Sequence, residues 1–158
     1  MNMIFGIVFA FSIFLDQFTK LKAVEILKDG SSIKILGDFL RFSYVENRGA
    51  AFGMLQNKQW FFIIMTIIMM AVLVYMFFYY KNITKLTKLS FVLIAGGAIG
   101  NLIDRIKLGY VVDFIDVRFG KIYDFPVFNI ADSCVVVGTI ILIFLILFNK
   151  FERSEING

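Results

Sequence analysis

Residues 125–148 read FPVFNIADSCVVVGTIILIFLILF, which is the longest apolar run of the chain. A helix that crosses a bilayer needs roughly 20 apolar residues, so this run is long enough to span one. Asp132 is its single charged residue. A carboxylate at membrane depth costs on the order of 3 kcal/mol or more, and such residues usually serve a function. Asp132 therefore indicates a functional site inside a membrane protein.

The composition fits one membrane domain that spans residues 1–158. The mean hydropathy is +0.83, and 59% of the residues are hydrophobic. The cations that raise the pI to about 9.2 are scattered, and several flank apolar runs, where they anchor helices at headgroups. A nucleic-acid partner is therefore not expected. With no histidine and Cys134 alone, a Ser-His-Asp triad, a Cys-His pair, an internal disulfide and a His-ligated metal are excluded, and no cofactor is expected.

Four apolar stretches predict four transmembrane helices. The stretches cover residues 3–15, 60–80, 89–103 and 125–148. Two of them are too short to span alone, so their helices must continue through polar residues toward one membrane boundary. The predicted helices cover about residues 3–27, 58–81, 87–107 and 126–149. Pro126 suits the first turn of the last helix, which would place Asp132 about 9 Å below the outer end of that helix.

The connections between these helices complete the predicted fold. Residues 32–36 and 39–45 are β-prone and are separated by Gly37 and Asp38, which predicts a small antiparallel sheet in the loop at about 31–57. The fold class is thus a mainly α membrane protein with four transmembrane helices and a small extracytoplasmic antiparallel β-sheet. Lys81, Lys85 and Lys88 indicate a cytoplasmic loop. Both termini are then cytoplasmic, and the loop at about 108–125 lies outside.

A second carboxylate, Asp113, lies between apolar residues in the outer loop that precedes the last helix. From the residues alone, a functional role and an ordinary solvated acid are about equally supported for Asp113. Asp116 and Asp124 are interpreted as solvated acids. If Asp113 packs over the end of the last helix, it forms a pair with Asp132. Two close carboxylates share one proton, and such a pair can activate water against a peptide carbonyl and protonate the leaving amine.

Other polar residues fall near the same boundary. Asn129 lies three residues before the carboxylate of the last helix and faces the same way. Asn101 and Arg105 are four residues apart and share a helix face. Three roles stay open for Arg105: pairing with Asp104 or Asp16, holding a carbonyl or phosphate of a substrate, or anchoring the helix end at headgroups.

Two other functions compete with a peptidase. A small proton- or cation-coupled membrane carrier could use Asp16, Asp104 and Asp132 as relays. Carriers usually contain repeated halves with interrupted helices, and no repeat is visible in this sequence. A structural membrane subunit is the third possibility, in which the buried acids simply pair with Lys20 and Arg105.

Five short motifs, taken in order, resemble those of the bacterial lipoprotein signal peptidases (signal peptidase II). They are DQxxK at 16–20, NxGAAFG at 47–53, GNxxDR at 100–105, VVDF at 111–114 and FNxADS at 128–133. Together they extend over nearly the whole chain, and the chain length and number of helices also agree. One such motif is weak evidence, whereas five in the same order are highly specific.

The resemblance implies an aspartic peptidase of the bacterial cytoplasmic membrane, with Asp113 and Asp132 as the catalytic pair near the extracytoplasmic face and an extracytoplasmic β-cradle. The substrates would be prolipoproteins that carry diacylglycerol on the lipobox cysteine and are cut just before it. Membrane lipids would be further partners, and globomycin-type cyclic depsipeptides would inhibit. The matched positions that would bind substrate or support the site are Asp16, Lys20, Asn47, Gly49, Asn101, Arg105, Asn129 and Ala131.

Overall fold

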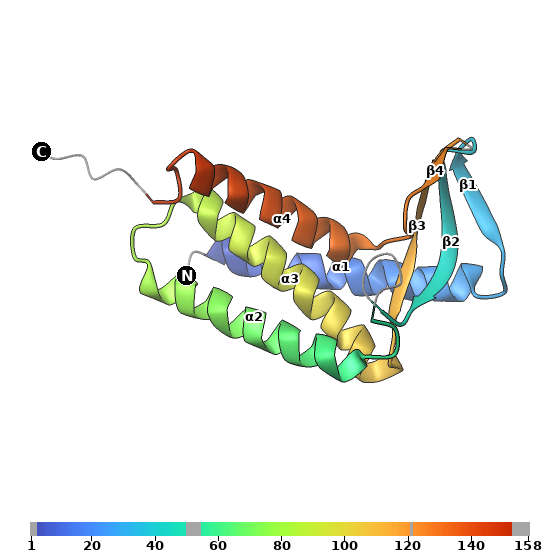
Figure 1. Ribbon diagram of the computed structural model, residues 1–158, viewed down its shortest axis with the longest axis horizontal. Coiled ribbons are helices and arrows are strands. Elements are labelled where there is room, and N and C mark those ends of the chain that lie inside the picture. The colour runs from blue at the N-terminus through green and yellow to red at the C-terminus, as the bar shows by residue number, and fades with distance from the viewer. Residues whose placement is uncertain (1–2, 50–54, 121, 153–158) are drawn as a thin grey trace, which may run out of the picture.

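Four helices lie side by side in the computed structural model, which describes residues 3–49, 55–120 and 122–152 (Figure 1). They are α1 (Met3–Leu27), α2 (Gln59–Tyr79), α3 (Lys85–Leu108) and α4 (Ile130–Leu147). Each helix is long and apolar enough to cross a membrane. Large Ile, Leu, Val, Phe and Met side chains cover their outer faces, which suits contact with lipid chains and not with water. The prediction of a four-helix membrane protein is confirmed.

Helix α3 occupies the centre of the bundle and packs against each of the other three helices. In the apolar 18-residue stretch of α3, 56% of the residues are buried inside the protein, against 6–22% in the corresponding stretches of the other three helices. Its glycines permit this close packing. A Cβ atom at Gly100 would lie only 2.6 Å from Asp16 Oδ2 of α1, and one at Gly97 would collide with the backbone of Ala131 in α4. Polar groups from three helices therefore meet at this level of the bundle.

A four-stranded antiparallel sheet stands at one end of the bundle, across the helix axes (Figure 1). Its strands, in spatial order, are β1 (Ser32–Leu36), β2 (Leu40–Asn47), β3 (Val111–Phe119) and β4 (Tyr123–Asp124). The predicted pairing of β1 with β2 is confirmed. The sequence did not predict that the connection between α3 and α4 supplies β3 and β4, so that this connection and the one between α1 and α2 form one sheet.

Strand β3 is seated on the end of α1. Val112 and Phe114 are buried against Ala23 and Leu27 of that helix. Because successive side chains of a strand point to opposite faces, Asp113 between them points away from α1. The alternation of β3 therefore directs Asp113 toward the start of α4.

Helix α4 begins four residues later than predicted. The expected start was near Pro126, whereas α4 begins at Ile130 with Asn129 as its N-cap. The physical reason is pairing with β3: Phe128 N–H donates to Ile115 O at 3.1 Å, and Ile115 N–H donates to Phe128 O at 2.8 Å. This pairing holds the preceding residues extended. Asp132 consequently lies in the first turn of α4, and the predicted depth of about 9 Å was wrong.

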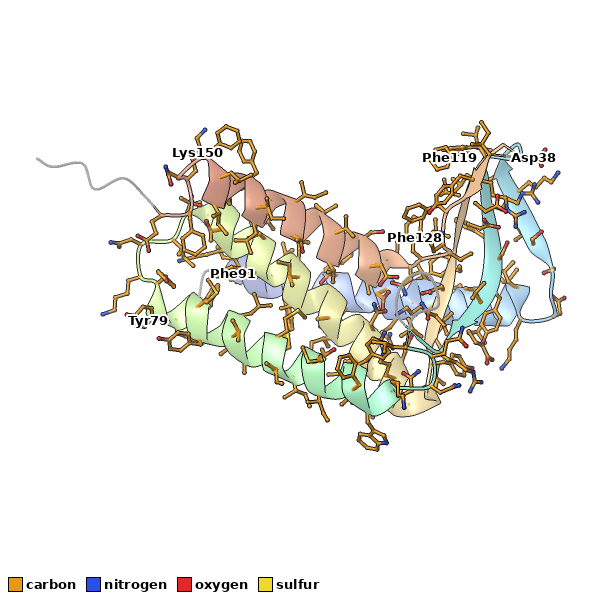
Figure 2. All side chains as sticks on the ribbon, viewed as in Figure 1. Asp38, Tyr79, Phe91, Phe119, Phe128 and Lys150 are labelled. Carbon is orange, nitrogen blue, oxygen red and sulfur yellow. The ribbon has the colours of Figure 1, made fainter. Side chains whose placement is uncertain are left out.

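The end of the bundle opposite the sheet is closed by a different contact. Phe151, which follows α4, stacks edge-on against Phe91 of α3 with 6.1 Å between ring centroids, and its carbonyl accepts from Thr87 Oγ1 at 2.7 Å. Figure 2 shows Phe91 and Lys150 at this end and Phe119 on the sheet at the other. The start of α1 and the end of α4 lie together, away from the sheet (Figure 1).

Candidate active site

Asp113 and Asp132 meet where the sheet joins the bundle, and both line a cavity of about 890 Å³. Asn129 connects them. Its side-chain amide donates to Asp113 Oδ1 at 2.6 Å, and its backbone N–H donates to Asp132 Oδ2 at 3.2 Å. The N-cap residue of α4 thus holds one carboxylate from β3 and one from its own helix. Asp113 is 1% exposed, whereas Asp132 is half-buried, so Asp113 is the member of the pair that is removed from bulk water.

The remaining carboxylate oxygens are also occupied by donors. Asn47 Nδ2 of β2 donates to Asp113 Oδ2 at 2.8 Å, and Asn101 Nδ2 of α3 donates to Asp132 Oδ1 at 2.7 Å. Each of the four oxygens therefore accepts one N–H. Donors of this kind stabilise an ionised carboxylate and fix its orientation.

Protonation of the pair follows from burial and charge. Burial raises the pKa of Asp113 to about 7, and the nearby charge of Asp132 contributes in the same direction. The hydrogen bonds from Asn47 and Asn129, together with the charge of Lys20, oppose this rise. Asp113 accordingly holds a proton below neutral pH and releases it as the pH rises through about 7. Such an arrangement supplies one protonated and one ionised carboxyl group near neutral pH.

A buried lysine lies behind the pair. Lys20 Nζ is 2.9 Å from Asp16 Oδ2 and 3.0 Å from Asp104 Oδ2, and it donates to Asn101 Oδ1 at 2.9 Å. All these groups are at most 9% exposed. Breaking a buried ion pair leaves an uncompensated charge and is strongly destabilising. This cluster therefore joins α1 firmly to α3.

The two acids of the cluster also hold backbone groups next to the pair. Asp16 Oδ1 accepts from Ala131 N–H at 2.9 Å, at the start of α4. Asp104 Oδ2 accepts from Val112 N–H at 3.0 Å, one residue before Asp113. The buried cluster consequently fixes both chain segments that carry the cavity-facing carboxylates.

Of the three roles left open for Arg105, an ion pair with Asp104 or Asp16 is not observed among the described residues. Within the described part of the chain it pairs with neither, because Lys20 occupies both acids. Its guanidinium instead lies 4.9 Å from the ring centroid of Phe62 and lines the cavity. Its Nε is buried without a partner among the described residues. Because the residue lines the cavity and forms no ion pair among the described residues, its guanidinium group is free to contact a molecule there.

All ten site residues proposed from the sequence fall within this region. Gly49, whose N–H donates to Asn47 Oδ1 at 3.0 Å, completes the set. Residues 50–53 of the second motif lie outside the described residues. Two residues that sequence reasoning did not propose for the site, Gln17 and Asp104, bond to each other at 2.9 Å within the buried cluster. Their positions inside the first and third motifs were the available signal.

Two further expectations have clear outcomes. Asp116 is not a solvated acid: it is 2% exposed, pairs with Arg118 at 2.8 Å and accepts from Ser43 Oγ of β2 at 3.2 Å. Asp124 is exposed, as expected. Across residues 3–49, 55–120 and 122–152, no group of three or more acidic or cysteine side chains is arranged to hold a metal ion.

Fold and site together define a multi-pass membrane protein with a carboxylate pair in a cavity between its helices and sheet. The family model described as signal peptidase (SPase) II matches residues 8–148. The lipoprotein signal peptidase of Caldanaerobacter subterraneus subsp. tengcongensis is 51% identical over 143 residues, which cover 90% of this chain and 94% of that one. That of Clostridium tetani is 48% identical over 151 residues, covering 95% and 97%.

Solved structures agree with the sequence relatives. A bacterial membrane enzyme determined by the in meso method at 2.3 Å resolution superposes with a TM-score of 0.88 at 38% identity, covering 98% of this chain and 95% of that one. A second, at 1.9 Å resolution, gives a TM-score of 0.84 at the same identity, covering 93% and 94%. The chain belongs to the signal peptidase II family and is a peptidase. The family resemblance seen in the five motifs is confirmed.

Proposed function

We propose that this protein removes signal peptides from prolipoproteins, with Asp113 and Asp132 as its catalytic pair. The observation that carries this proposal is the geometry of the two carboxylates. They come from different elements, share Asn129 as a common donor and line one cavity. Family membership supplies the reaction class, and the site supplies groups that can perform it.

The reaction uses one water molecule. The ionised carboxylate takes a proton from this water, and the water oxygen attacks the carbonyl carbon of the scissile peptide bond. The protonated carboxyl group then gives its proton to the leaving nitrogen as the C–N bond breaks. The products are a carboxylic acid and an amine, and the pair returns to its original total of one proton. Arg105, a cation that lines the cavity, would bind an oxygen of the substrate through its guanidinium group.

The lining of the cavity suits a lipidated peptide. Beyond the polar groups near the sheet, its wall is formed by Met69, Ala98, Val135 and Val136, from α2, α3 and α4. Apolar walls between helices can receive acyl chains or the apolar part of a signal peptide. The proposed substrate is a prolipoprotein with diacylglycerol on the cysteine that follows the cut. Each buried CH₂ contributes about 0.8 kcal/mol, so two acyl chains would anchor the scissile bond at the correct depth.

The charge distribution supports an extracytoplasmic site. The connection of α2 to α3 lies at the end opposite the sheet (Figure 1), and it carries Lys81 with Lys85 and Lys88 at the start of α3. Lys150 lies at the same end (Figure 2). By the positive-inside rule this end faces the cytoplasm. The sheet and cavity would then lie at the outer face of the bacterial cytoplasmic membrane, with membrane lipids around the bundle. Cyclic depsipeptides of the globomycin type are the proposed inhibitors of this cavity.

Cleavage of a synthetic lipobox peptide tests the proposal. Purified protein in lipid is incubated with the peptide in two forms, with and without diacylglycerol on the cysteine, and the products are identified by mass. We expect one cut, immediately before the cysteine, and a much higher kcat/KM for the lipidated form, since remote binding energy serves orientation at the reacting bond. Equal kcat/KM for the two forms would contradict the proposed substrate class, and absence of any cut would contradict the activity.

A further inference from the structure

The amide groups around the carboxylate pair each need a fixed orientation. An asparagine presents an acceptor oxygen on one side and donor hydrogens on the other. In Asn47, Oδ1 accepts from Gly49 N–H at 3.0 Å, which leaves Nδ2 for Asp113. In Asn129, Oδ1 accepts from Asp132 N–H at 2.8 Å, which leaves Nδ2 for the same carboxylate. Backbone N–H groups therefore orient both amides.

Asn101 is oriented in another way. Its Nδ2 donates to Asp132 Oδ1 at 2.7 Å, while its Oδ1 accepts from Lys20 Nζ at 2.9 Å and from Asn129 Nδ2 at 3.1 Å. A donor that carries a charge makes a stronger hydrogen bond than a neutral amide. The ammonium of Lys20 is thus the strongest group acting on the Asn101 oxygen. If the amide were reversed, its oxygen would face the Asp132 carboxylate, acceptor against acceptor.

We propose that Lys20 is a positioning residue of the peptidase, whose ammonium fixes the amide of Asn101 so that Asn101 donates to Asp132 during the reaction. This inference rests on the proposed function and specifies how one residue behind the cavity acts on it. Lys20 does not line the cavity, and it is 3% exposed, so it acts through Asn101 and not by contact with substrate.

A second role for the lysine has to be separated from this one. Lys20 also lies between Asp16 and Asp104, at 2.9 and 3.0 Å, and it could serve only to neutralise these two acids. When ionised, the three groups together carry one negative charge. In the double variant Lys20→Met/Asp16→Asn, Asp104 alone carries that charge. The double variant therefore keeps the total charge of the cluster and removes the donor to Asn101.

The experiment compares Asp16→Asn, Lys20→Met and the double variant, reconstituted in lipid, with the lipidated lipobox peptide as the probe. Thermal unfolding of each variant reports whether it is folded. The cluster of the double variant carries the same charge as that of the wild type, whereas the cluster of Asp16→Asn is neutral, so both serve as references. We expect the double variant to fold and to show a kcat roughly tenfold to a hundredfold below that of either reference, the loss typical of a misplaced catalytic group. KM should stay within about twofold, because the cavity wall is unchanged. Lys22→Met is the matched control on the same helix, since the Lys22 side chain is 52% exposed and pairs only with Glu25 among the described residues.

Three results would overturn the inference. Recovery of kcat in the double variant to the value of the wild type or of Asp16→Asn would mean that Lys20 only neutralises acids. Failure of both Lys20 variants to fold, with Asp16→Asn folded, would assign Lys20 to the fold. A higher KM with unchanged kcat would place the effect in substrate binding. If the wild-type protein itself leaves the peptide intact, the proposed function fails first, and this outcome is recognised before any variant is compared.

Discussion

Asn129 and Asp132 bond to each other twice. The backbone N–H of Asn129 donates to Asp132 Oδ2 at 3.2 Å, and the backbone N–H of Asp132 donates to Asn129 Oδ1 at 2.8 Å. This reciprocal pair is a capping box that satisfies N–H groups at the start of α4. Asp132 lines the cavity, and the Asn129 side chain behind it donates to Asp113 Oδ1 at 2.6 Å. The capping box that begins α4 therefore also orients the Asp132 carboxylate, one of the proposed catalytic pair.

The two roles of Asn129 can be separated by substitution. Serine is about as good an N-cap as asparagine, but its short hydroxyl cannot reach Asp113. We expect Asn129→Ser to unfold within a few degrees of the wild type and to lose most of its cleavage activity. Asn129→Ala should lose activity and about 1 kcal/mol of stability as well, the usual loss for a missing cap. Thermal unfolding and peptide cleavage, measured on the same preparations, check both expectations.

The control for this pair of variants is Thr19→Ala. The Thr19 hydroxyl donates only to carbonyls of its own helix among the described residues, at 2.8 and 2.9 Å, and Thr19 does not line the cavity, so its loss should leave cleavage nearly unchanged. Full activity in Asn129→Ser would show that the bond from Asn129 to Asp113 is dispensable.

The pH dependence of cleavage should report Asp113. Burial raises the pKa of Asp113 to about 7, so the group is protonated below this pH and ionised above it. If the reaction needs one proton on the pair, kcat/KM falls as the pH rises through about 7. Asn47 donates to Asp113 and holds its pKa down. Asn47→Ala should therefore move the alkaline limb of the profile to higher pH.

Ser43→Ala is the comparison for that profile. Ser43 lies on the same strand as Asn47, but its hydroxyl bonds to Asp116 at 3.2 Å. Its loss should leave the alkaline limb where it is in the wild type. A limb that does not move in Asn47→Ala, or that moves equally in Ser43→Ala, would remove Asp113 as its origin.

Much of the fold could be predicted from local sequence. The exceptions share one cause, which is pairing with residues that are distant in the sequence. The four helices and the β1–β2 hairpin follow from hydropathy and turn residues within a few positions of each other. The start of α4 does not, because Pro126 favours a helix start while Phe128 is held extended by pairing with Ile115, thirteen residues away in the sequence. The burial of Asp116 is not visible in the local sequence for the same reason, since it depends on pairing of β3 with β2 and on a bond from Ser43, both distant in the sequence.

In the candidate site, too, contacts within one helix could be predicted from the sequence, and contacts between helices could not. The spacing of Asp16 and Lys20 places them on one helix face, so their ion pair is visible in the sequence. The competition between Lys20 and Arg105 for Asp104 is not, because it depends on how α1 and α3 pack. Lys20 forms the ion pair with Asp104, and Arg105 lines the cavity instead.

Topology is tested with single cysteines in a Cys134→Ser background. Asp38 lies at the turn of the sheet (Figure 2), and Lys85 begins α3, whose start lies at the opposite end of the bundle (Figure 1). In intact cells, an impermeant thiol reagent should label a cysteine at position 38 and not one at position 85. After membrane disruption both should react, which controls for accessibility. The reverse labelling pattern in intact cells would place the cavity at the cytoplasmic face.

The central claim, that Asp113 and Asp132 cleave the peptide bond, is tested most directly by single-turnover cleavage of the lipidated lipobox peptide. Asp113→Asn and Asp132→Asn nearly preserve the shape of each side chain and remove its acid–base function. We expect each variant to bind the peptide, to remain folded, and to cleave it at least about a thousandfold more slowly than the wild type, within the range lost with general acid–base catalysis. Cleavage by either folded variant at a rate within about tenfold of the wild type would contradict the assignment of that aspartate.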